Sequence, residues 1–242
     1  MKPLRFRLRE ASLSRGIPQH VVEKDYALSY ILAGVSSHPV LKNSLVFKGG
    51  TALKKMFFGE YRFSEDLDFS CLDAPKGDEL ERCVPLCRVK MEISHDELVL
   101  LEPERRTLLH EYHGETLQSE VACYCIEEII AEKLRTLLQT HEKLVTRGWN
   151  RPRSRDYYDL WRILTEFGDA FMPGKVVGIL DRKNAHRNVS FRGPDDFFSK
   201  ELVSEASRNW ENSLDAFVID LPEFDQVMKE LKPLVQKLLG GS

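Results

Sequence analysis

The sequence predicts an α+β protein whose first half mixes strands with helices and whose second half is helical. A short apolar run at residues 45–47 and a run at residues 88–94 that alternates apolar and polar side chains are typical of strands. From Ile126 onward, apolar residues recur with the 3.6-residue period of a helix. This change of period predicts two domains, residues 1–125 and residues 126–242.

The first half begins with helices. Residues from about 10 to 43 are expected to be helical, because Pro18 suits a first helical turn and the apolar residues after it share one face. The strand at residues 45–47 then leads into a helix at residues 51–58, which Gly59 ends.

The remainder of the first half is predicted to be mostly extended. The stretch at residues 73–78 has turn composition, and residues 79–84 predict a short helical turn. Extended segments are expected at residues 63–70, 88–94, 97–101 and 120–125.

In the second half, a stripe that includes Ile130, Leu134 and Leu137 predicts a long amphipathic helix from Ile126. Four later helices are expected at residues 155–167, 175–180, 197–214 and 222–239.

The chain has 242 residues, 42% of them hydrophobic and 30% charged, as in an ordinary soluble globular protein. It shows neither a signal peptide nor an apolar run of the roughly 20 residues that a membrane helix needs, so we expect a cytoplasmic protein without membrane contact. With a formal net charge of −3, a polynucleotide would have to be held by a local basic patch.

The five cysteines lack zinc-knuckle spacing and are expected to be reduced thiols, although a mixed site with His110 or His113 stays open.

Two aspartates, Asp66 and Asp68, stand two apart in an apolar frame. In a strand they would share one face while Leu67 and Phe69 face the core. Adjacent carboxylates repel each other unless a cation bridges them, so the pair predicts a Mg²⁺ or Mn²⁺ site, with Glu92 as a third ligand from another strand. The alternative is a solvated strand edge.

A glycine pair followed by a helix lies just upstream of these aspartates. Gly49 and Gly50 allow a phosphate to approach the backbone, and Thr51 offers a hydroxyl. Further phosphate contacts are expected from Lys48, Arg62 and Ser64. Taken alone, the same residues would describe a tight turn between a strand and a helix.

Lys133 falls within the apolar stripe of the long helix, where its ammonium group either extends to the rim or points at a triphosphate. Asp159 lies among apolar residues and is expected to pair with Lys133 or an arginine, or to act as a base. Asp156 is assigned to the helix dipole. Glu132 and Arg135 are placed on the solvent side.

The segment from residue 147 to residue 155 is basic and contains an interleaved tryptophan, as in sites that hold a nucleic-acid backbone and stack a base. An ordinary solvated loop is the alternative. The candidate acceptor-binding residues are Arg147, Trp149, Arg151, Arg153 and Arg155.

Together these motifs resemble the AbiEii/AbiGii nucleotidyltransferase toxins. The resemblance covers roughly residues 15 to 165 and is specific because the motifs occur in this order. They are Glu23-Lys-Asp-Tyr26, Phe47-Lys-Gly-Gly-Thr-Ala-Leu, Arg62-Phe-Ser-Glu-Asp-Leu-Asp-Phe, Lys90-Met-Glu-Ile-Ser, Glu127-Glu-Ile-Ile-Ala-Glu-Lys-Leu-Arg and Arg155-Asp-Tyr-Tyr-Asp-Leu.

The resemblance implies a polymerase-β-like nucleotidyltransferase core, with a small mixed sheet flanked by helices, followed by a helical C-terminal region. It implies a toxin–antitoxin or phage-defence setting with a cognate antitoxin, and an acceptor such as the 3′ end of tRNA or another RNA.

Carried over by position, Gly49, Gly50 and Thr51 bind phosphate and the two aspartates bind metal. Glu92 corresponds to the third carboxylate, Lys133 to the triphosphate lysine and Asp159 to the acid of the last motif. The connection between Phe69 and Lys90 is shorter than is usual in the family.

The function expected from these residues is Mg²⁺-dependent transfer of a nucleoside monophosphate from an NTP to RNA or protein, an activity of the EC 2.7.7 type. The first alternative is a nucleotide-binding or partner-binding protein that keeps the fold but is catalytically impaired, as the short connection suggests. A metal-dependent phosphohydrolase is a third possibility, although no residue stands out as a base that activates water.

Overall fold

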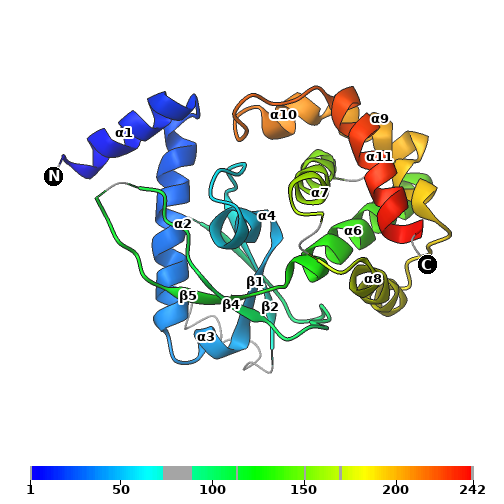
Figure 1. Cartoon of the computed structure of the whole chain (residues 1–242), viewed down its shortest axis with the longest axis horizontal. Coiled ribbons are helices and arrows are strands. Elements are labelled where there is room, and N and C mark those ends of the chain that lie inside the picture. Colours follow the sequence, from blue (N-terminus) through cyan, green and yellow to red (C-terminus); the bar gives the residue numbers. More distant parts are fainter. Residues whose placement is uncertain (1, 73–88, 113, 150, 169–170, 241–242) are drawn as a thin grey trace. The chain divides into compact units, whose positions relative to one another are not determined.

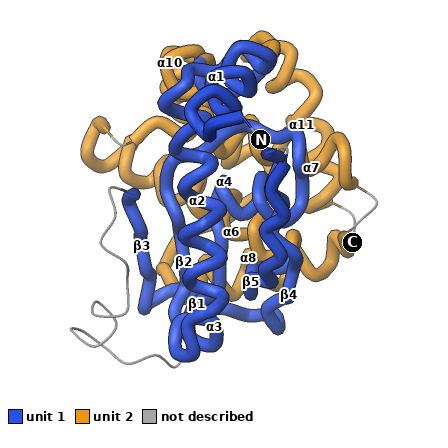
Figure 2. Tube along the Cα trace, turned by 90° about the vertical axis from the view of Figure 1, so that its left-hand side faces the viewer, with its two compact units in different colours: residues 1–125, 216–219 blue, residues 126–215, 220–242 orange. Residues whose placement is uncertain are grey.

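The computed structural model describes residues 2–72, 89–112, 114–149, 151–168 and 171–240. The chain divides into two compact units (Figure 2). The first unit comprises Met1–Cys125 with Ala216–Ile219, and the second comprises Ile126–Asp215 with Asp220–Ser242. Within the predicted strand at 88–94, the structure shows a strand at Lys90–Ser94, whereas the expectations for residues 73–84 lie outside the described residues.

The first unit opens with three helices, α1 (Leu4–Arg15), α2 (Gln19–Ser37) and α3 (Leu41–Ser44). Helix α1 ends because Gly16 adopts a left-handed conformation with φ 64°, and its N–H bonds back to the carbonyl of Ser12. Pro18 then precedes the first turn of α2. The predicted helical region is therefore present, but it begins earlier and is interrupted twice.

The sheet of the first unit is mixed, and its strand order is β3-β2-β1-β5-β4. Strand β1 pairs antiparallel with β2 and parallel with β5, while β2 and β3 run parallel. This small mixed sheet flanked by helices confirms the predicted α+β fold (Figure 1). The strands are β1 (Leu45–Lys48), β2 (Asp66–Cys71), β3 (Lys90–Ser94), β4 (Glu104–Thr107) and β5 (Glu120–Cys123).

A short helical segment joins β1 to β2. It consists of α4 (Gly49–Ala52) and a π-helix, η1 (Leu53–Phe57). The helix starts at the first glycine of the pair, two positions before the predicted start at Thr51. The next strand begins only at Asp66, so the expected strand at residues 63–65 is absent.

One core fixes the orientation of β2. Leu67 and Phe69 are both fully buried, together with Phe47 of β1 and with Leu28 and Leu32 of α2. The prediction that Leu67 and Phe69 face the core is confirmed. Because side chains alternate along a strand, Asp66 and Asp68 lie on the other face of β2.

One predicted strand of the first unit is absent, and one strand that the sequence did not predict is present. Residues 97–101 form no strand, and β4 lies a few residues later, at Glu104–Thr107. The sequence of β4 is charged and carries no apolar alternation. Its Arg106 instead packs its guanidinium 4.0 Å from the ring centroid of Phe57, a cation–π contact that only the tertiary structure creates.

The second unit is helical among its described residues (Figure 1). The apolar stripe of its first helix is buried as predicted, with Ile130, Leu134 and Leu137 fully enclosed. The helices are α6 (Ile126–Arg147), α7 (Ser154–Glu166), α8 (Pro173–Arg187), the 3₁₀ turn η2 (Pro194–Phe198), α9 (Lys200–Arg208), α10 (Trp210–Leu214) and α11 (Phe224–Gly240).

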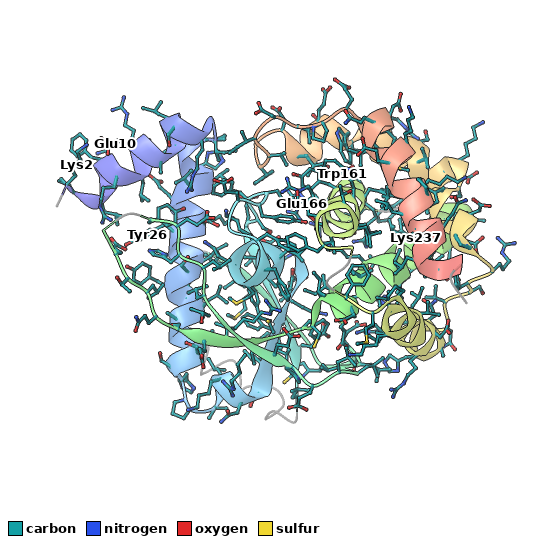
Figure 3. The ribbon with its side chains drawn as sticks, viewed as in Figure 1. Lys2, Glu10, Tyr26, Trp161, Glu166 and Lys237 are labelled. Atoms are coloured by element: carbon teal, nitrogen blue, oxygen red, sulfur yellow. The ribbon has the colours of Figure 1, made fainter. Side chains whose placement is uncertain are left out.

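The predicted helix at residues 197–214 is broken into three pieces. Ser199 caps the start of α9 by accepting a hydrogen bond from the N–H of Leu202, and Asn209 separates α9 from α10. Trp161 of α7, labelled in Figure 3, donates its indole N–H to Glu230 of α11 over 2.8 Å. No helix in the described part of the chain is both long and apolar enough to cross a bilayer.

Candidate active site

The glycine turn and the aspartate strand of the first unit meet directly. Gly49 has φ 79°, a left-handed conformation that side chains rarely adopt, and a Cβ added to it would lie 3.2 Å from Cγ of Asp68 and overlap its carboxylate. The Asp68 carboxylate therefore lies against the backbone of the turn. This places one of the three predicted metal ligands beside the predicted phosphate-binding glycine.

Arg62 occupies the adjacent position. A Cβ added to Gly50 would come within 3.0 Å of Cζ of Arg62 and overlap its guanidinium. The Arg62 side chain is buried and also donates to the carbonyl of Phe63 over 3.3 Å. A carboxylate and a guanidinium thus lie against neighbouring glycines.

Thr51 joins the glycine turn to the aspartate strand, although Thr51 and Asp66 are 15 positions apart in the sequence. Its hydroxyl donates to the main-chain carbonyl of Asp66 over 2.6 Å, so in this structure the hydroxyl holds the turn to β2. Lys48 and Ser64, which were also predicted to contact phosphate, are both buried. The Lys48 ammonium lies 5.7 Å from the ring centroid of Tyr124.

The third predicted carboxylate, Glu92, is in register with Asp68 across the parallel pair β2–β3, which places the two on the same face of the sheet. However, half of the Glu92 side chain is exposed, and it forms an ion pair with Lys90 on its own strand. Within the described ranges, no three His, Cys, Asp or Glu side chains gather closely enough to hold a metal. The donor set that fits a hard cation is therefore the Asp66/Asp68 pair, whose carboxylate oxygens are the ligands that Mg²⁺ favours.

Two buried lysines hold the segment behind the glycine turn. In η1, Lys55 pairs with Asp25 of α2 over 2.7 Å, and Lys54 pairs with Glu111 over 3.0 Å. Burial alone would raise the pKa of the Asp25 carboxyl, but the nearby Lys55 and Lys54 ammonium groups hold that pKa below its ordinary value. No role is predicted for Lys55 or Glu111 from the sequence, and Asp25 enters only as part of the motif Glu23-Lys-Asp-Tyr26. The signals in the sequence are that motif and the Lys-Lys pair in an otherwise apolar helix.

Lys133 and Asp159 form an ion pair in the second unit, as predicted, with 2.7 Å between the ammonium and a carboxylate oxygen. Asp156 also accepts from Lys133, over 2.8 Å, and lies 3.6 Å from Arg153. Burial raises the pKa of Asp156, but Lys133 and Arg153 outweigh it and hold that pKa below its usual range. Asp156 is therefore a partner of Lys133, in addition to the helix-dipole role predicted for it. The prediction that Arg135 faces solvent is wrong, because Arg135 is buried.

The basic segment that precedes α7 separates into two kinds of residue. Trp149 has 74% of its surface exposed, and Arg147 and Arg151 are exposed as well. Arg153 donates to the hydroxyl of Thr140, and Arg155 donates to the carbonyl of Ser213, each over 3.0 Å. Only the first three of the five predicted acceptor residues therefore present their side chains outward.

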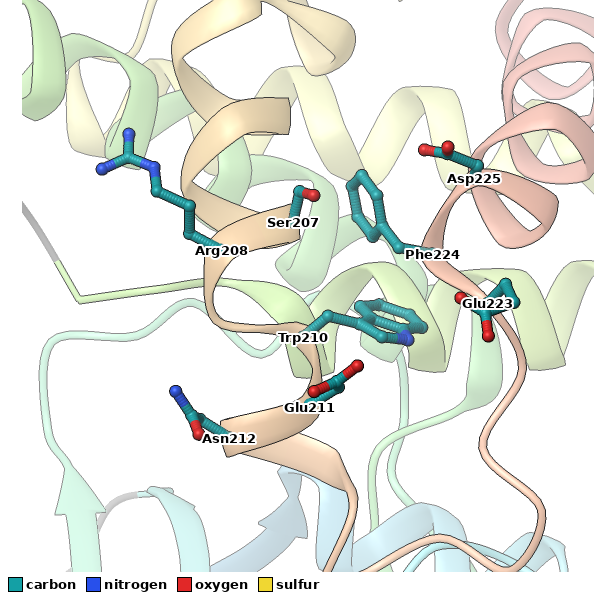
Figure 4. A pocket seen from close by; sticks show the side chains of 8 residues that line it. All are labelled: Ser207, Arg208, Trp210, Glu211, Asn212, Glu223, Phe224 and Asp225. Carbon is teal, nitrogen blue, oxygen red and sulfur yellow. The ribbon is translucent and has the colours of Figure 1, made fainter.

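A groove of about 320 Å³ also lies in the second unit (Figure 4). Three of its side chains are carboxylates, and its one cation, Arg208, is engaged with Glu205 over 3.3 Å. This charge repels a triphosphate, so the groove is unsuitable as the nucleotide site. The lining residues are Ser207, Arg208, Trp210, Glu211, Asn212, Glu223, Phe224 and Asp225.

Comparison with known families agrees with this geometry. The family described as "Nucleotidyl transferase AbiEii toxin, Type IV TA system" matches residues 30–86 and 82–230. The chain belongs to this AbiEii family. The resemblance to the AbiEii nucleotidyltransferase toxins is thereby confirmed, and the matched residues extend across both units.

Two solved structures show the same fold. The nucleotidyltransferase toxin MenT4 from Mycobacterium tuberculosis H37Rv has a TM-score of 0.69 and 19% identity, covering 98% of this chain and 90% of its own. JHP933 from Helicobacter pylori has a TM-score of 0.50 and 19% identity, covering 92% of this chain and 93% of its own. A search of curated protein sequences finds no match.

Proposed function

We propose that this AbiEii toxin transfers a nucleoside monophosphate from an NTP to an acceptor hydroxyl in a Mg²⁺- or Mn²⁺-dependent reaction of the EC 2.7.7 type. The observation that carries the proposal is the contact between the Asp68 carboxylate and the backbone of Gly49. A phosphate on the glycine turn would lie beside the Asp66/Asp68 pair, which is the juxtaposition that nucleotidyl transfer requires.

The candidate site residues of the first unit have distinct roles in this proposal. Gly49 and Gly50 let phosphate oxygens approach the main chain, and the Arg62 guanidinium against Gly50 offsets phosphate charge. Asp66 and Asp68 would hold the metal ion, which supplies charge neutralisation at the phosphate under attack. Glu92 is the third ligand in the proposal, and its present pairing with Lys90 would have to be given up.

Lys133 is proposed to bind the triphosphate. Two carboxylates hold its ammonium at 2.7 Å and 2.8 Å and thereby fix its position. Asp159 is fully buried and already bonded to Lys133, so we assign it the task of orienting that lysine rather than removing a proton from the acceptor.

The acceptor is proposed to be RNA, such as the 3′ end of tRNA, held through Arg147, Trp149 and Arg151. An exposed indole between exposed arginines combines a stacking surface with contacts to phosphates. A protein acceptor is the other candidate. Family membership also supports a cognate antitoxin, and we place the protein in the cytoplasm with a role in phage defence.

The test uses the purified protein, Mg²⁺, total tRNA and each α-labelled NTP in turn. Label is expected to enter RNA with the wild type and to be lost with Asp66→Ala or Asp68→Ala, because either change removes a metal ligand from the pair. Glu120→Ala, which alters an exposed carboxylate of β5, serves as the matched control and should retain transfer. Transfer that persists in either aspartate variant, measured on folded protein, contradicts this mechanism.

A second candidate function follows from the carboxylate count. The described residues contain a pair rather than a group of three possible metal ligands. A protein that binds nucleotide without transferring it would show NTP binding that depends on Asp66 and Asp68, with no label in RNA or protein.

A further inference from the structure

A buried ion pair holds η1, the π-helix that follows the glycine turn in the chain. The Lys55 ammonium is 2.7 Å from Oδ2 of Asp25, and each side chain is 1% exposed. The Tyr112 hydroxyl lies 2.9 Å from the same carboxylate oxygen. Lys55 belongs to η1, which continues α4 without a break, so the pair connects α2 to the segment that begins at Gly49.

Stability alone explains this pair poorly. Burying two charges is costly, and replacing a buried pair by apolar side chains of similar volume is often neutral or favourable. The other oxygen of Asp25, Oδ1, has no hydrogen-bond partner among the described residues, which adds to the cost. What the pair does provide is position, because the carboxylate comes from α2 and η1 must lie where Lys55 can reach it.

The front of the same segment is tied to the carboxylate strand. Thr51 donates to the carbonyl of Asp66 over 2.6 Å, so the segment is held to β2 at one end and to α2 at the other. The attachment to α2 is made from within a π-helix, a form that is rare and concentrated at functional sites.

We propose that Asp25 is a positioning residue that, through Lys55, sets the placement of the glycine turn against Asp66 and Asp68. Among the described residues its carboxylate bonds to Lys55 and Tyr112, so we expect it to act on the glycine turn through Lys55 and η1. The proposal rests on the proposed function for its kinetic consequence and stands on the structure for its mechanical one.

The test compares Asp25→Leu/Lys55→Met with the wild type. This double variant removes both charges and fills the space with apolar side chains, and the Tyr112 hydroxyl keeps the Val22 carbonyl, 2.9 Å away, as an acceptor. We expect a thermal midpoint within a few degrees of the wild type, together with roughly a tenfold or greater rise in KM for the NTP, because small misplacements of binding groups have large kinetic effects. We also expect faster amide exchange confined to residues 49–57.

Glu128→Gln is the matched control. Glu128 forms a comparably buried pair with Lys183 in the helical unit, at 3.2 Å and with side chains 1% and 0% exposed. It is expected to lower the thermal midpoint while leaving KM for ATP, CTP, GTP and UTP and the exchange at residues 49–57 unchanged.

A folded double variant with wild-type KM and wild-type exchange at residues 49–57 overturns the proposal. If the double variant does not fold, Tyr112→Phe, which removes one hydrogen bond to Asp25, is measured in its place and should shift both readouts in the same direction. If the wild type transfers no nucleotide, the proposed function fails, and the amide exchange alone decides whether Asp25 positions the turn.

Discussion

Gly49 answers two separate demands at one position. Its φ of 79° disfavours any residue with a Cβ, and the space that a Cβ would need is filled by the Asp68 carboxylate. The strand periodicity in the sequence is enough to place Asp66 and Asp68 on one face. It contains no information about which part of the chain that face meets, because the contact with Gly49 depends on the antiparallel register of β1 and β2.

Gly49→Ala is therefore expected to impair the protein through both demands. The backbone strain should lower the free energy of unfolding by about 1–2 kcal/mol, and displacement of Asp68 should lower nucleotidyl transfer more than tenfold. Denaturant melts and the transfer assay measure the two effects.

Gly34→Ala is the control, since Gly34 lies inside α2 with nothing within 4 Å of an added Cβ. It should stabilise the protein by up to about 1 kcal/mol. Equal losses of stability and transfer in both variants would contradict the special role of Gly49.

The side chains around Lys133 show how far residue types can predict a site. An aspartate among apolar residues needs a partner, which predicts that Asp159 pairs with Lys133 or an arginine or acts as a base, and the structure shows the pair with Lys133. Asp156 was missed because an acid in a first helical turn already has a sufficient local explanation. Arg135 was misplaced because the buried face of α6 is wider than its apolar stripe.

At the scale of elements, helices with a strong apolar period were predictable and charged strands were not. Helices α6 and α7 follow their stripes closely, whereas β4 reads Glu-Arg-Arg-Thr and is a strand only because β5 pairs with it. The π-helix η1 is likewise not predicted from the sequence, and its Lys54 and Lys55 form ion pairs with Glu111 and Asp25, residues far away in the chain. Tertiary pairing overrides propensity at these elements.

A titratable residue, Glu115, joins α1 to α2 within the first unit. Glu115 accepts hydrogen bonds from Tyr26 and Tyr30 of α2 and forms an ion pair with Arg7 of α1, and His110 lies 3.5 Å away. The hydrogen bond from Tyr30 and those from Arg7 and Tyr26 lower the pKa of Glu115 to about 2, against a smaller opposing effect of burial.

Because the pKa is lower in the folded protein, the stabilisation by Glu115 is present above its ordinary pKa and is lost as the pH falls toward about 2. Glu115→Gln should therefore show a flatter loss of stability with pH between the ordinary glutamate pKa and pH 2. Urea melts at a series of pH values test this, with Glu120→Gln on exposed β5 as control. A wild-type slope in Glu115→Gln would contradict the assignment.

For the whole molecule, charge decides how an RNA acceptor can be held. The formal net charge of −3 provides no general attraction to a polyanion, so an RNA-binding surface must be local and must carry its own cations. Among the candidates from the sequence, the structure leaves Arg147, Trp149 and Arg151 exposed and engages Arg153 and Arg155 within the helical unit.

Substitutions at the exposed residues should separate stacking from charge. Trp149→Ala is expected to weaken RNA binding by about 1–3 kcal/mol with little change in its salt dependence, because a stacking contact releases no counterions. Arg147→Ala/Arg151→Ala should instead reduce the slope of log K against log[salt] by roughly 1.4, at about 0.7 for each phosphate contact with a single strand. Neither variant should shift the thermal midpoint, since all three side chains are exposed. Titrations of labelled tRNA at several salt concentrations measure both quantities, with Arg182→Ala on exposed α8 as the control for loss of one positive charge. If Arg182→Ala lowers the slope by about 0.7, as much as is expected for each arginine of the double variant, RNA responds to overall charge and this segment is not its binding surface.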